Sequence, residues 1–461
     1  MGEESRESNR ARMPSRRDFV RWSAAAGIAG TFTGMGVLSA LGYVKGPQEP
    51  PPAWQVEPGV VDYGLVPEGP SGPDPHVLKI AQWYDYWPGT LLEGWVAYMK
   101  EMFELRVDYR WDIYTSNEEL FHWLTLSKRR YDVIFPSNYL VDLMKKADMI
   151  YTLNPEWLPN LGPDFSNMFQ DLVNTPAEDP YDRRRVDGEM RWVSVPYQWG
   201  TTGLGFRTDR ISREDAVELG YDVLWMAEFR TLDLRKRMRM LDDMRDVLGA
   251  GLKKAGWEWQ SELGVEPTGL YPPDGIQWTT NETDPARLNA AGTWLRRNKP
   301  LLFGYTSTDQ ATSLLSGGIV NQVWSGDVMY AIQPNAATPQ PVDYIIPRQG
   351  STWWVDCAAI HSKSRNLWLA HQFLNYLHEI RPHRALTKWN MYSTPNRAAY
   401  DTDDPNQPWE FPNGYDTRDD PRLYPNRFAP AEFRVCDPSR DVGLATLLRL
   451  YNPIWFDLAA T

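Results

Sequence analysis

Four segments of the chain combine acidic and aromatic residues. They are Trp83-Tyr84-Asp85-Tyr86-Trp87, Asp243 with Asp246, Trp324 in Asn321-Gln322-Val323-Trp324-Ser325-Gly326, and Trp353-Trp354-Val355-Asp356. A protonated alkyl amine needs both kinds of group. Carboxylates replace the water around each ammonium, and aromatic faces pack on the methylene chain and attract the cation. The pattern is therefore typical of a slot for a small polyamine, with carboxylates at its two ends.

The carboxylates Asp243 and Asp246 raise a second hypothesis. They lie three residues apart, so on a helix they would share one face and could act as a catalytic pair in an exported carbohydrate-active hydrolase. No glycine-rich phosphate loop, nucleophile elbow or zinc-binding helix motif accompanies them. The six histidines are scattered, and we expect His371 and His378 to be surface residues. The sequence therefore favours binding without catalysis, metal or cofactor.

Composition and charge narrow the class of partner. A chain of 461 residues with 42% apolar residues can fold into two domains with sizeable cores. The net charge is −12, and residues 1–45 carry +3, which leaves −15 on the remainder. Such a chain repels phosphate backbones, so nucleic acid is not expected as a partner, whereas a cationic ligand is compatible. The two cysteines, Cys357 and Cys436, leave one disulfide bridge open.

The first 45 residues have the pattern of a twin-arginine export signal. Arg16-Arg17 precede a mostly apolar stretch, residues 22–43, that contains no acidic residue. We therefore expect the twin-arginine machinery to export the folded protein to the periplasm or the outer face of the cytoplasmic membrane. The apolar stretch could be cleaved off or could stay as an anchor. Residues 46–76 are rich in Pro and Gly and predict an extended linker.

Strands and helices alternate after the linker. We expect strands over 77–81, 105–111 and 131–135, and helices over 91–103 and 118–126, the last capped by Ser116 or Asn117. This alternation predicts an α/β sheet whose binding residues lie at the carboxyl ends of strands.

The rest of the chain contains a run of small residues and two segments that look like insertions. Gly200-Thr201-Thr202-Gly203 could form a hinge or a tight turn. Residues 257–278 and 401–425 look like insertions, and the second is expected to form proline-pinned surface loops. The second contains two acidic clusters, 401–405 and 416–421, for which a calcium site is an alternative to simple solvation.

Taken in order, seven segments resemble the bacterial periplasmic spermidine/putrescine-binding proteins of ABC transporters. The matching segments are 82–86, 131–144, 194–205, 241–247, 323–326, 353–360 and 392–396. The resemblance implies a two-lobed periplasmic-binding-protein fold, with a hinge between the lobes and a ligand cleft at their interface. It divides the chain into a first lobe of residues 77–200 plus 354–400 and a second of 205–350 plus 405–461.

The resemblance also implies a set of ligand-binding residues. Aromatic and hydroxyl side chains would line the slot, and four aspartates would hold the amines: Trp83, Tyr86, Ser137, Tyr139, Trp324, Trp354 and Tyr392, then Asp85, Asp243, Asp246 and Asp356. Asp246 stands where the family often has Glu, and Tyr84 replaces a small hydroxyl residue, so the length of the polyamine stays open.

The implied partner is an ABC transporter permease in the membrane, served by a monomeric binding protein. Two alternatives keep the fold: another small cationic metabolite as ligand, or a polyamine sensor that signals to a membrane receptor.

Overall fold

The computed structural model describes residues 52–70, 72–127, 129–173, 180–270 and 278–460. The predicted export signal lies outside these residues. In the part of the chain that the structure describes, no helix is long and apolar enough to cross a membrane.

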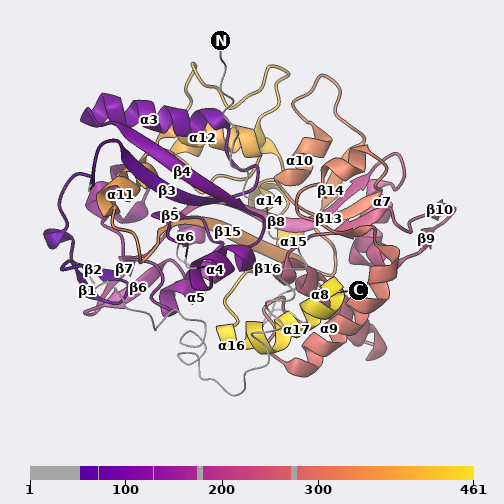
Figure 1. The fold of residues 1–461 in the computed structure, drawn as a ribbon. Helices are drawn as coiled ribbons and strands as arrows, with labels where there is room; N and C mark the ends of the chain where they lie inside the picture. The colour runs from indigo at the N-terminus through magenta and orange to yellow at the C-terminus, as the bar shows by residue number, and fades with distance from the viewer. Residues whose placement is uncertain (1–51, 71, 128, 174–179, 271–277, 461) are drawn as a thin grey trace, which may run out of the picture.

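A mixed sheet of ten strands runs through the whole molecule (Figure 1). Eight of its strands follow in the order β12 (Gly304–Tyr305), β11 (Met238–Met240), β13 (Val320–Trp324), β8 (Val195–Arg207), β15 (Ser351–Ile360), β5 (Val133–Ile134), β3 (His76–Trp83) and β4 (Val107–Tyr114). Two further strands join it, β14 (Val342–Ile345) on β8 and β16 (Cys436–Pro438) on β15. The α/β class expected from the sequence is confirmed.

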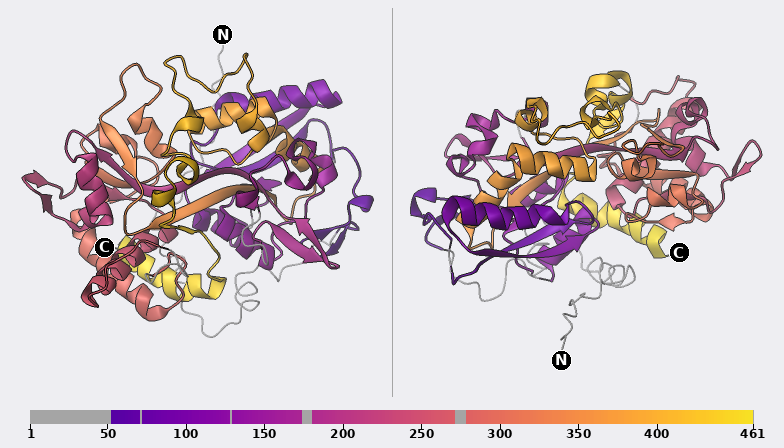
Figure 2. Two further views of the ribbon diagram at one scale, coloured as in Figure 1. Left: turned by 180° about the vertical axis from the view of Figure 1, so that it is seen from behind. Right: turned by 90° about the horizontal axis from the view of Figure 1, so that it is seen from above.

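Two long strands connect the halves of this sheet. The first part of β8 pairs antiparallel with β15 from Thr201↔Trp353 to Val195↔Ala358, and its second part pairs with β13 and β14. The end of β15 pairs with β5, which belongs to the other half. Figure 2 shows the two halves flanking these strands from behind and from above. Both strands therefore belong to the two halves at once.

The first half contains β3, β4 and β5 and is covered on both faces. The helices α3 (Gly89–Phe103) and α12 (Ile380–Asn390) lie above the sheet in Figure 1, and α4 (Asn117–Thr125) and α5 (Asn138–Lys146) lie below it. Leu78 and Ile80 of β3 are fully buried. The helix α11 (Leu367–Leu377) packs on α3.

Most of the expected elements of this half are confirmed. The Ser116 hydroxyl accepts a hydrogen bond from the backbone N–H of Glu119 and caps α4, as predicted. Strand β4 begins at Val107 and not at residue 105, because Glu104 ends α3 with φ 57° and the Leu105 N–H bonds back to Met99 O.

The second half contains α7 (Arg213–Leu219), α8 (Met244–Glu262), α9 (Pro285–Asn298), α10 (Asp327–Ile332) and α17 (Asn452–Ala460). The segment 257–278, which looks like an insertion in the sequence, begins inside α8, because this helix continues to Glu262 and packs along α9. Residues 271–277 of that segment lie outside the described part of the chain.

The small residues 200–203 lie inside β8 and not in a turn. A side chain at Gly200 would meet the Ser325 hydroxyl and the Trp354 ring, and one at Gly203 would meet the carbonyl of Ile345. Close packing against neighbouring strands therefore explains why glycine occupies these two positions.

The predicted linker is wrong for residues 55–65. Strands β1 (Gln55–Glu57) and β2 (Val60–Val61) form a hairpin in which both valines of β2 are buried. The Val61 N–H donates to Thr152 Oγ1 (3.1 Å) and the Tyr63 hydroxyl to Thr152 O (2.6 Å). Burial of this short apolar segment fixes it on the first half of the sheet.

The loop over 401–425 is less solvated than expected. Asp416 and Asp420 are buried, and each pairs with an arginine two residues on, at 2.8 Å (Arg418) and 2.6 Å (Arg422). Trp409 in the same loop is only 2% exposed. No group of three acidic, histidine or cysteine residues that could hold a metal ion occurs in the described ranges, so the calcium alternative finds no support there.

Two expectations on single residues are also decided. His371 and His378 are buried, contrary to the prediction, because their rings bond backbone groups inside the first half. Burial lowers the pKa of His371 to about 4. Cys357 and Cys436 are both buried and free, so no bridge joins them.

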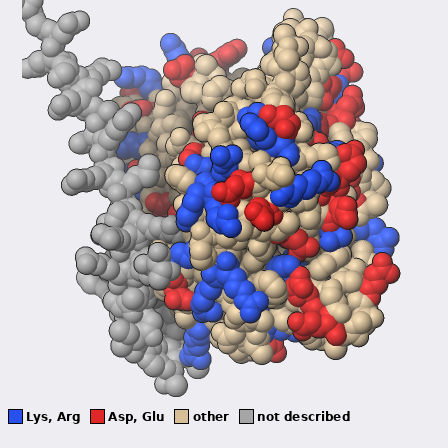
Figure 3. All heavy atoms as spheres, turned by 90° about the vertical axis from the view of Figure 1, so that its right-hand side faces the viewer, with Lys and Arg blue, Asp and Glu red and all other residues tan. Residues whose placement is uncertain are grey.

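Charged side chains of both signs are interspersed over the surface seen in Figure 3. Pairs such as Arg235–Asp233 (3.2 Å) are more than half exposed. By contrast, Lys253 of α8 and Asp437 of β16 form a pair (2.8 Å) in which both side chains are fully buried. Asp437 also accepts from the Thr280 N–H. Its pair with Lys253 fixes the C-terminal strand to α8.

Replacing Asp437 by Asn should destabilise the protein strongly, because the Lys253 ammonium would stay buried without its counter-charge. We expect the free energy of unfolding to fall by about 3–5 kcal/mol, measured by denaturant unfolding followed by tryptophan fluorescence. Asp233→Asn is the control at an exposed pair and should change it by less than about 1 kcal/mol. Equal losses in the two variants would contradict this account.

Candidate ligand-binding site

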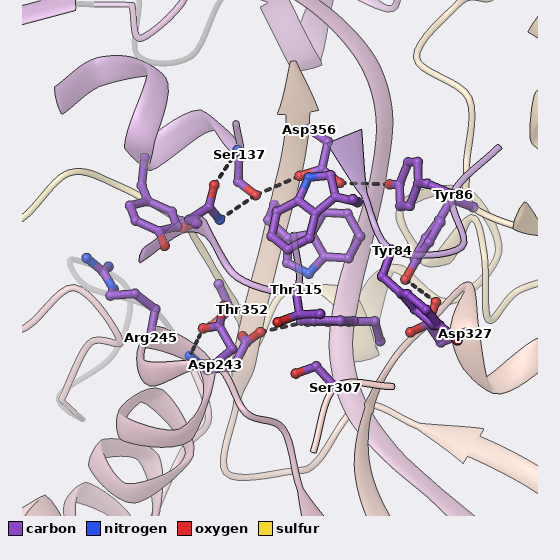
Figure 4. A pocket seen from close by; sticks show the side chains of 18 of the residues that line it. Tyr84, Tyr86, Thr115, Ser137, Asp243, Arg245, Ser307, Asp327, Thr352 and Asp356 are labelled. Carbon is purple, nitrogen blue, oxygen red and sulfur yellow. Dashed lines mark hydrogen bonds between the residues drawn. The ribbon is translucent and has the colours of Figure 1, made fainter. Parts of the chain in front are cut away.

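A cavity of about 710 Å³, counted to its open mouth, lies where the two halves of the sheet meet. Side chains from both halves and from both connecting strands line it (Figure 4). Its wall includes ten of the eleven predicted site residues, namely Trp83, Tyr86, Ser137, Tyr139, Asp243, Asp246, Trp324, Trp354, Asp356 and Tyr392. Segments far apart in the sequence are therefore brought together, as the resemblance implied.

Asp356 lies deep in this cavity, on β15 at a register shift between Asp356 and Cys357. The Ser137 hydroxyl donates to its Oδ1 (2.6 Å) and the Tyr86 hydroxyl to its Oδ2 (2.7 Å). Burial raises the pKa of Asp356 to about 7, although these two hydrogen bonds oppose the rise. The carboxylate is held in a fixed orientation and has no cationic partner among these contacts.

Asp243 and Asp246 both line the cavity wall, although only Asp246 lies within a helix. Asp243 is the N-cap of α8, and its side chain accepts from the Asp246 N–H (3.0 Å). Asp246 lies in the first turn and accepts from Thr202 Oγ1 (2.8 Å) and Trp324 Nε1 (2.7 Å). The two side chains therefore face one cavity, Asp243 from the cap and Asp246 from the first helical turn. Burial, and for Asp243 also the charge of Asp246, raises the pKa of both carboxyl groups.

Aromatic rings form the walls between these carboxylates. Tyr86 stacks on Tyr392 with ring centroids 5.1 Å apart, and Trp354 meets Tyr392 edge-on at 5.3 Å. Trp83 and Trp324 come from opposite halves of the sheet and meet edge-on at 6.1 Å. These contacts fix the ring planes that a hydrocarbon chain or a cation would touch.

The sequence analysis missed several residues at the cavity. Asp327, at the start of α10, accepts from the Tyr392 hydroxyl (2.7 Å) and from Gln310 Nε2 (2.6 Å). Burial raises its pKa to about 6. Its position three residues after Trp324 was the available signal. The other lining residues outside the prediction are Tyr84, Thr115, Asn117, Arg245, Thr280, Ser307, Thr352 and Ser439.

Arg245 brings a positive charge to one end of the cavity. Its guanidinium lies over the ring of Tyr139 (4.8 Å) and donates to Asn281 Oδ1 (2.9 Å). The Tyr139 hydroxyl donates to Glu118 Oε1 (3.1 Å). Burial, followed by the charge of Asp243, raises the pKa of Glu118 to about 8. Glu118 is therefore largely neutral at neutral pH, despite the nearby arginine.

Asp85 is the predicted site residue that the structure places off the cavity wall. It is exposed, with φ 49° in the turn after β3. This left-handed residue turns the chain so that Tyr86, and not Asp85, points at Asp356. The charge of Asp85 still acts on the site, because it raises the pKa of Asp327.

Comparison with known families identifies the class of protein. The family model described as bacterial extracellular solute-binding protein matches residues 126–413, which is more than half of the chain. The chain belongs to this family. It is a solute-binding protein that acts outside the cytoplasm and not an enzyme, so the hydrolase hypothesis for Asp243 and Asp246 is wrong.

Individual relatives of this solute-binding protein are polyamine-binding proteins. The spermidine/putrescine-binding periplasmic protein of Escherichia coli K12 is 27% identical over 330 residues, which is 71% of this chain and 79% of that protein. The putrescine-binding periplasmic protein SpuD of Pseudomonas aeruginosa is 27% identical over 334 residues, 71% of this chain and 80% of that protein.

A solved structure described as a putative spermidine/putrescine ABC transporter of Listeria monocytogenes superimposes with a TM-score of 0.63. The two chains are 20% identical, and the match covers 83% of this chain and 98% of the other. This likeness confirms the two-lobed periplasmic-binding-protein fold of the solute-binding protein.

The raised carboxyl pKa values predict how ligand affinity depends on pH. Asp356 is partly protonated near pH 7 in the free protein, whereas an ammonium ligand binds the ionised form and lowers its pKa. For an ammonium ligand, binding then releases protons, and its affinity should rise from about pH 5 to about pH 8. Above about pH 10 it should fall, because the amines themselves lose their protons.

Calorimetric titration in buffers of different ionisation enthalpy measures this proton release directly. Affinities that stay constant from about pH 5 to about pH 8, with no protons released, would show that these carboxyl groups do not meet a cation.

Proposed function

We propose that this solute-binding protein captures a small polyamine outside the cytoplasm and delivers it to the permease of an ABC transporter. The observation that carries the proposal is the placement of Asp243, Asp246, Asp327 and Asp356 along one aromatic-walled cavity. Four carboxylates face a single guanidinium, that of Arg245. An ionised ligand that satisfies them must carry several positive charges.

The chemistry of the walls supports a hydrocarbon chain between those charges. A buried carboxylate shifts its pKa upward because the charged form is poorly solvated, and burial raises the pKa of both Asp356 and Asp327 in this way. An ammonium beside each one would restore the ionised form. The stacked pair Tyr86–Tyr392 and the Trp354 ring would pack on the methylenes.

The relatives support the same ligand class. Two proteins named for spermidine or putrescine binding each match about 71% of this chain. At 27% identity they favour the class without fixing the length of the amine.

The binding mechanism in this proposal is closure of two lobes over the ligand. The lobes are residues 77–200 plus 354–400 and residues 205–350 plus 405–461, with β8 and β15 as the connecting strands. In the conformation described, the Tyr330 hydroxyl donates to Trp389 O (2.8 Å) and the Tyr392 hydroxyl to Asp327 Oδ1 (2.7 Å), between segments assigned to different lobes. Opening would break these contacts, and ligand contacts on both sides of the cavity would favour the closed state.

Export and assembly complete the proposal. Arg16-Arg17 would direct the folded chain through the twin-arginine machinery, and the protein would reach the permease as a monomer. Delivery to a permease, and not signalling to a receptor, is the function proposed.

Arg245 favours a second candidate, another small cationic metabolite that also carries a hydrogen-bond acceptor. Within the described residues, its Nε and Nη1 atoms are buried and have no hydrogen-bond partner. A carboxylate or amide at one end of a ligand could bind there. γ-Aminobutyrate and putrescine differ in this respect, since one end of the former is a carboxylate, so their relative affinities separate the two candidates.

Calorimetric titration of the purified protein with putrescine, spermidine and spermine tests the proposal. We expect saturable binding at one site per chain. Asp356→Asn should weaken it by about 2–5 kcal/mol, because a buried ammonium loses its counter-charge.

The matched control is Asp85→Asn, which changes a carboxylate close to the cavity but off its wall. It should weaken binding by less than about 1 kcal/mol, since exposed charges interact weakly. A folded protein that binds none of the three amines, or variants that lose affinity equally, would contradict the proposal.

A further inference from the structure

Tyr84 differs from every other residue of the cavity wall in its exposure. Most lining residues are buried, and four are not: Tyr84, Thr115, Trp324 and Asp327. Of these, Tyr84 alone is exposed, at 45%. The four residues therefore mark the mouth of the cavity, and the Tyr84 side chain meets both the cavity and solvent.

The turn after β3 holds Tyr84 at this mouth. Its neighbours Trp83 and Tyr86 are 7% and 6% exposed and lie inside the cavity. The Tyr84 N–H donates to Tyr114 O (2.9 Å), which fixes the backbone to the end of β4. The left-handed Asp85 then turns the chain back inward. The backbone is thus anchored, while the ring is the outermost aromatic group of the turn.

Asp327 is the carboxylate that belongs to the same mouth. Figure 4 shows Tyr84 and Asp327 on one side of the cavity and Asp243 and Arg245 on the other. Asp243 and Asp356 are buried and lie farther in. A chain of amines that starts at an inner carboxylate reaches Asp327 last, and any longer ligand must continue past Tyr84.

We infer that Tyr84 sets the maximum length of the ligand by closing the cavity just outside Asp327. This inference rests on the proposed function. Tyr84 is a specificity-determining residue in it: its ring covers the outermost ammonium and excludes water there, and it blocks ligands that would extend into solvent. Replacement by a small residue opens the mouth and lets the cavity continue outward.

The test uses α,ω-diamines of increasing length, which change the spacing of the charges and not their number. The series is diaminopropane, putrescine, cadaverine, diaminohexane and diaminooctane, titrated into the native protein and into Tyr84→Ala. We expect the length that binds best to move to a longer diamine in Tyr84→Ala. The affinity ratio of diaminooctane to putrescine should rise at least about tenfold, a factor that corresponds to about 1.4 kcal/mol.

Tyr84→Phe is the matched control, since it keeps the ring and removes only the hydroxyl. Its length preference should equal that of the native protein. An unchanged length preference in Tyr84→Ala, with normal binding by the native chain, would overturn this inference alone. A native chain that is folded and binds no diamine would overturn the proposed function and the inference together. A uniform loss of affinity for all lengths would show that Tyr84 only covers the site.

Discussion

The cost of keeping several carboxylates together in a poorly solvated cavity governs this structure. Asp243, Asp246 and Asp356 are each less than 10% exposed, and burial raises the pKa of every one of them. Their partners are neutral donors: hydroxyl groups, an indole N–H and a backbone N–H. Neutral donors orient a carboxylate and offset part of its desolvation, but they do not cancel its charge. In the proposed function, a cationic ligand completes this site.

The fold provides those donors from elements that other interactions hold in place. The N-terminus of α8 carries Asp243 and Asp246, and the buried pair Lys253–Asp437 fixes the same helix to β16. Asp356 projects from β15 at a register shift, where an irregular strand can re-aim a side chain. Gly200 leaves the space in which the Trp354 ring packs against β8. Rigid supports of this kind hold the carboxylates in fixed positions, so that they cannot relieve their mutual repulsion by moving away from one another.

Much of the site was predictable, and the failures have identifiable causes. Trp354 and Asp356 lie two residues apart in β15 and line the same cavity, because the two-residue period of a strand is independent of its surroundings. Asp243 and Asp246 both line the cavity, although only Asp246 lies within a helix. Asp85 was read as a ligand, because a sequence does not reveal that φ is positive at one residue of a turn.

Other features depend on contacts between segments that are far apart in the sequence. Local sequence patterns do not indicate these contacts. Asp327 reaches the site only because β13 and α10 are folded against Tyr392. The loop 401–425 was read as solvated, yet Asp416 and Asp420 are buried and paired with Arg418 and Arg422. The hairpin over 55–61 was read as linker, although Val60 and Val61 are buried against the first half of the sheet. The strand and helix pattern, by contrast, was set locally, and most of it was predicted.

Function and stability oppose each other at this site. In the free protein, each carboxyl group with a raised pKa makes folding less favourable as the pH rises through that pKa, because the unfolded chain ionises more easily. A bound ammonium reverses the sign of this effect by stabilising the ionised, folded form. In the proposed function, the ligand thus stabilises the closed structure. The free energy that desolvation of the carboxylates costs in the ligand-free protein is then offset when the cation binds. Replacing the carboxylates by neutral residues would relieve the free protein and remove the reason for a cation to enter.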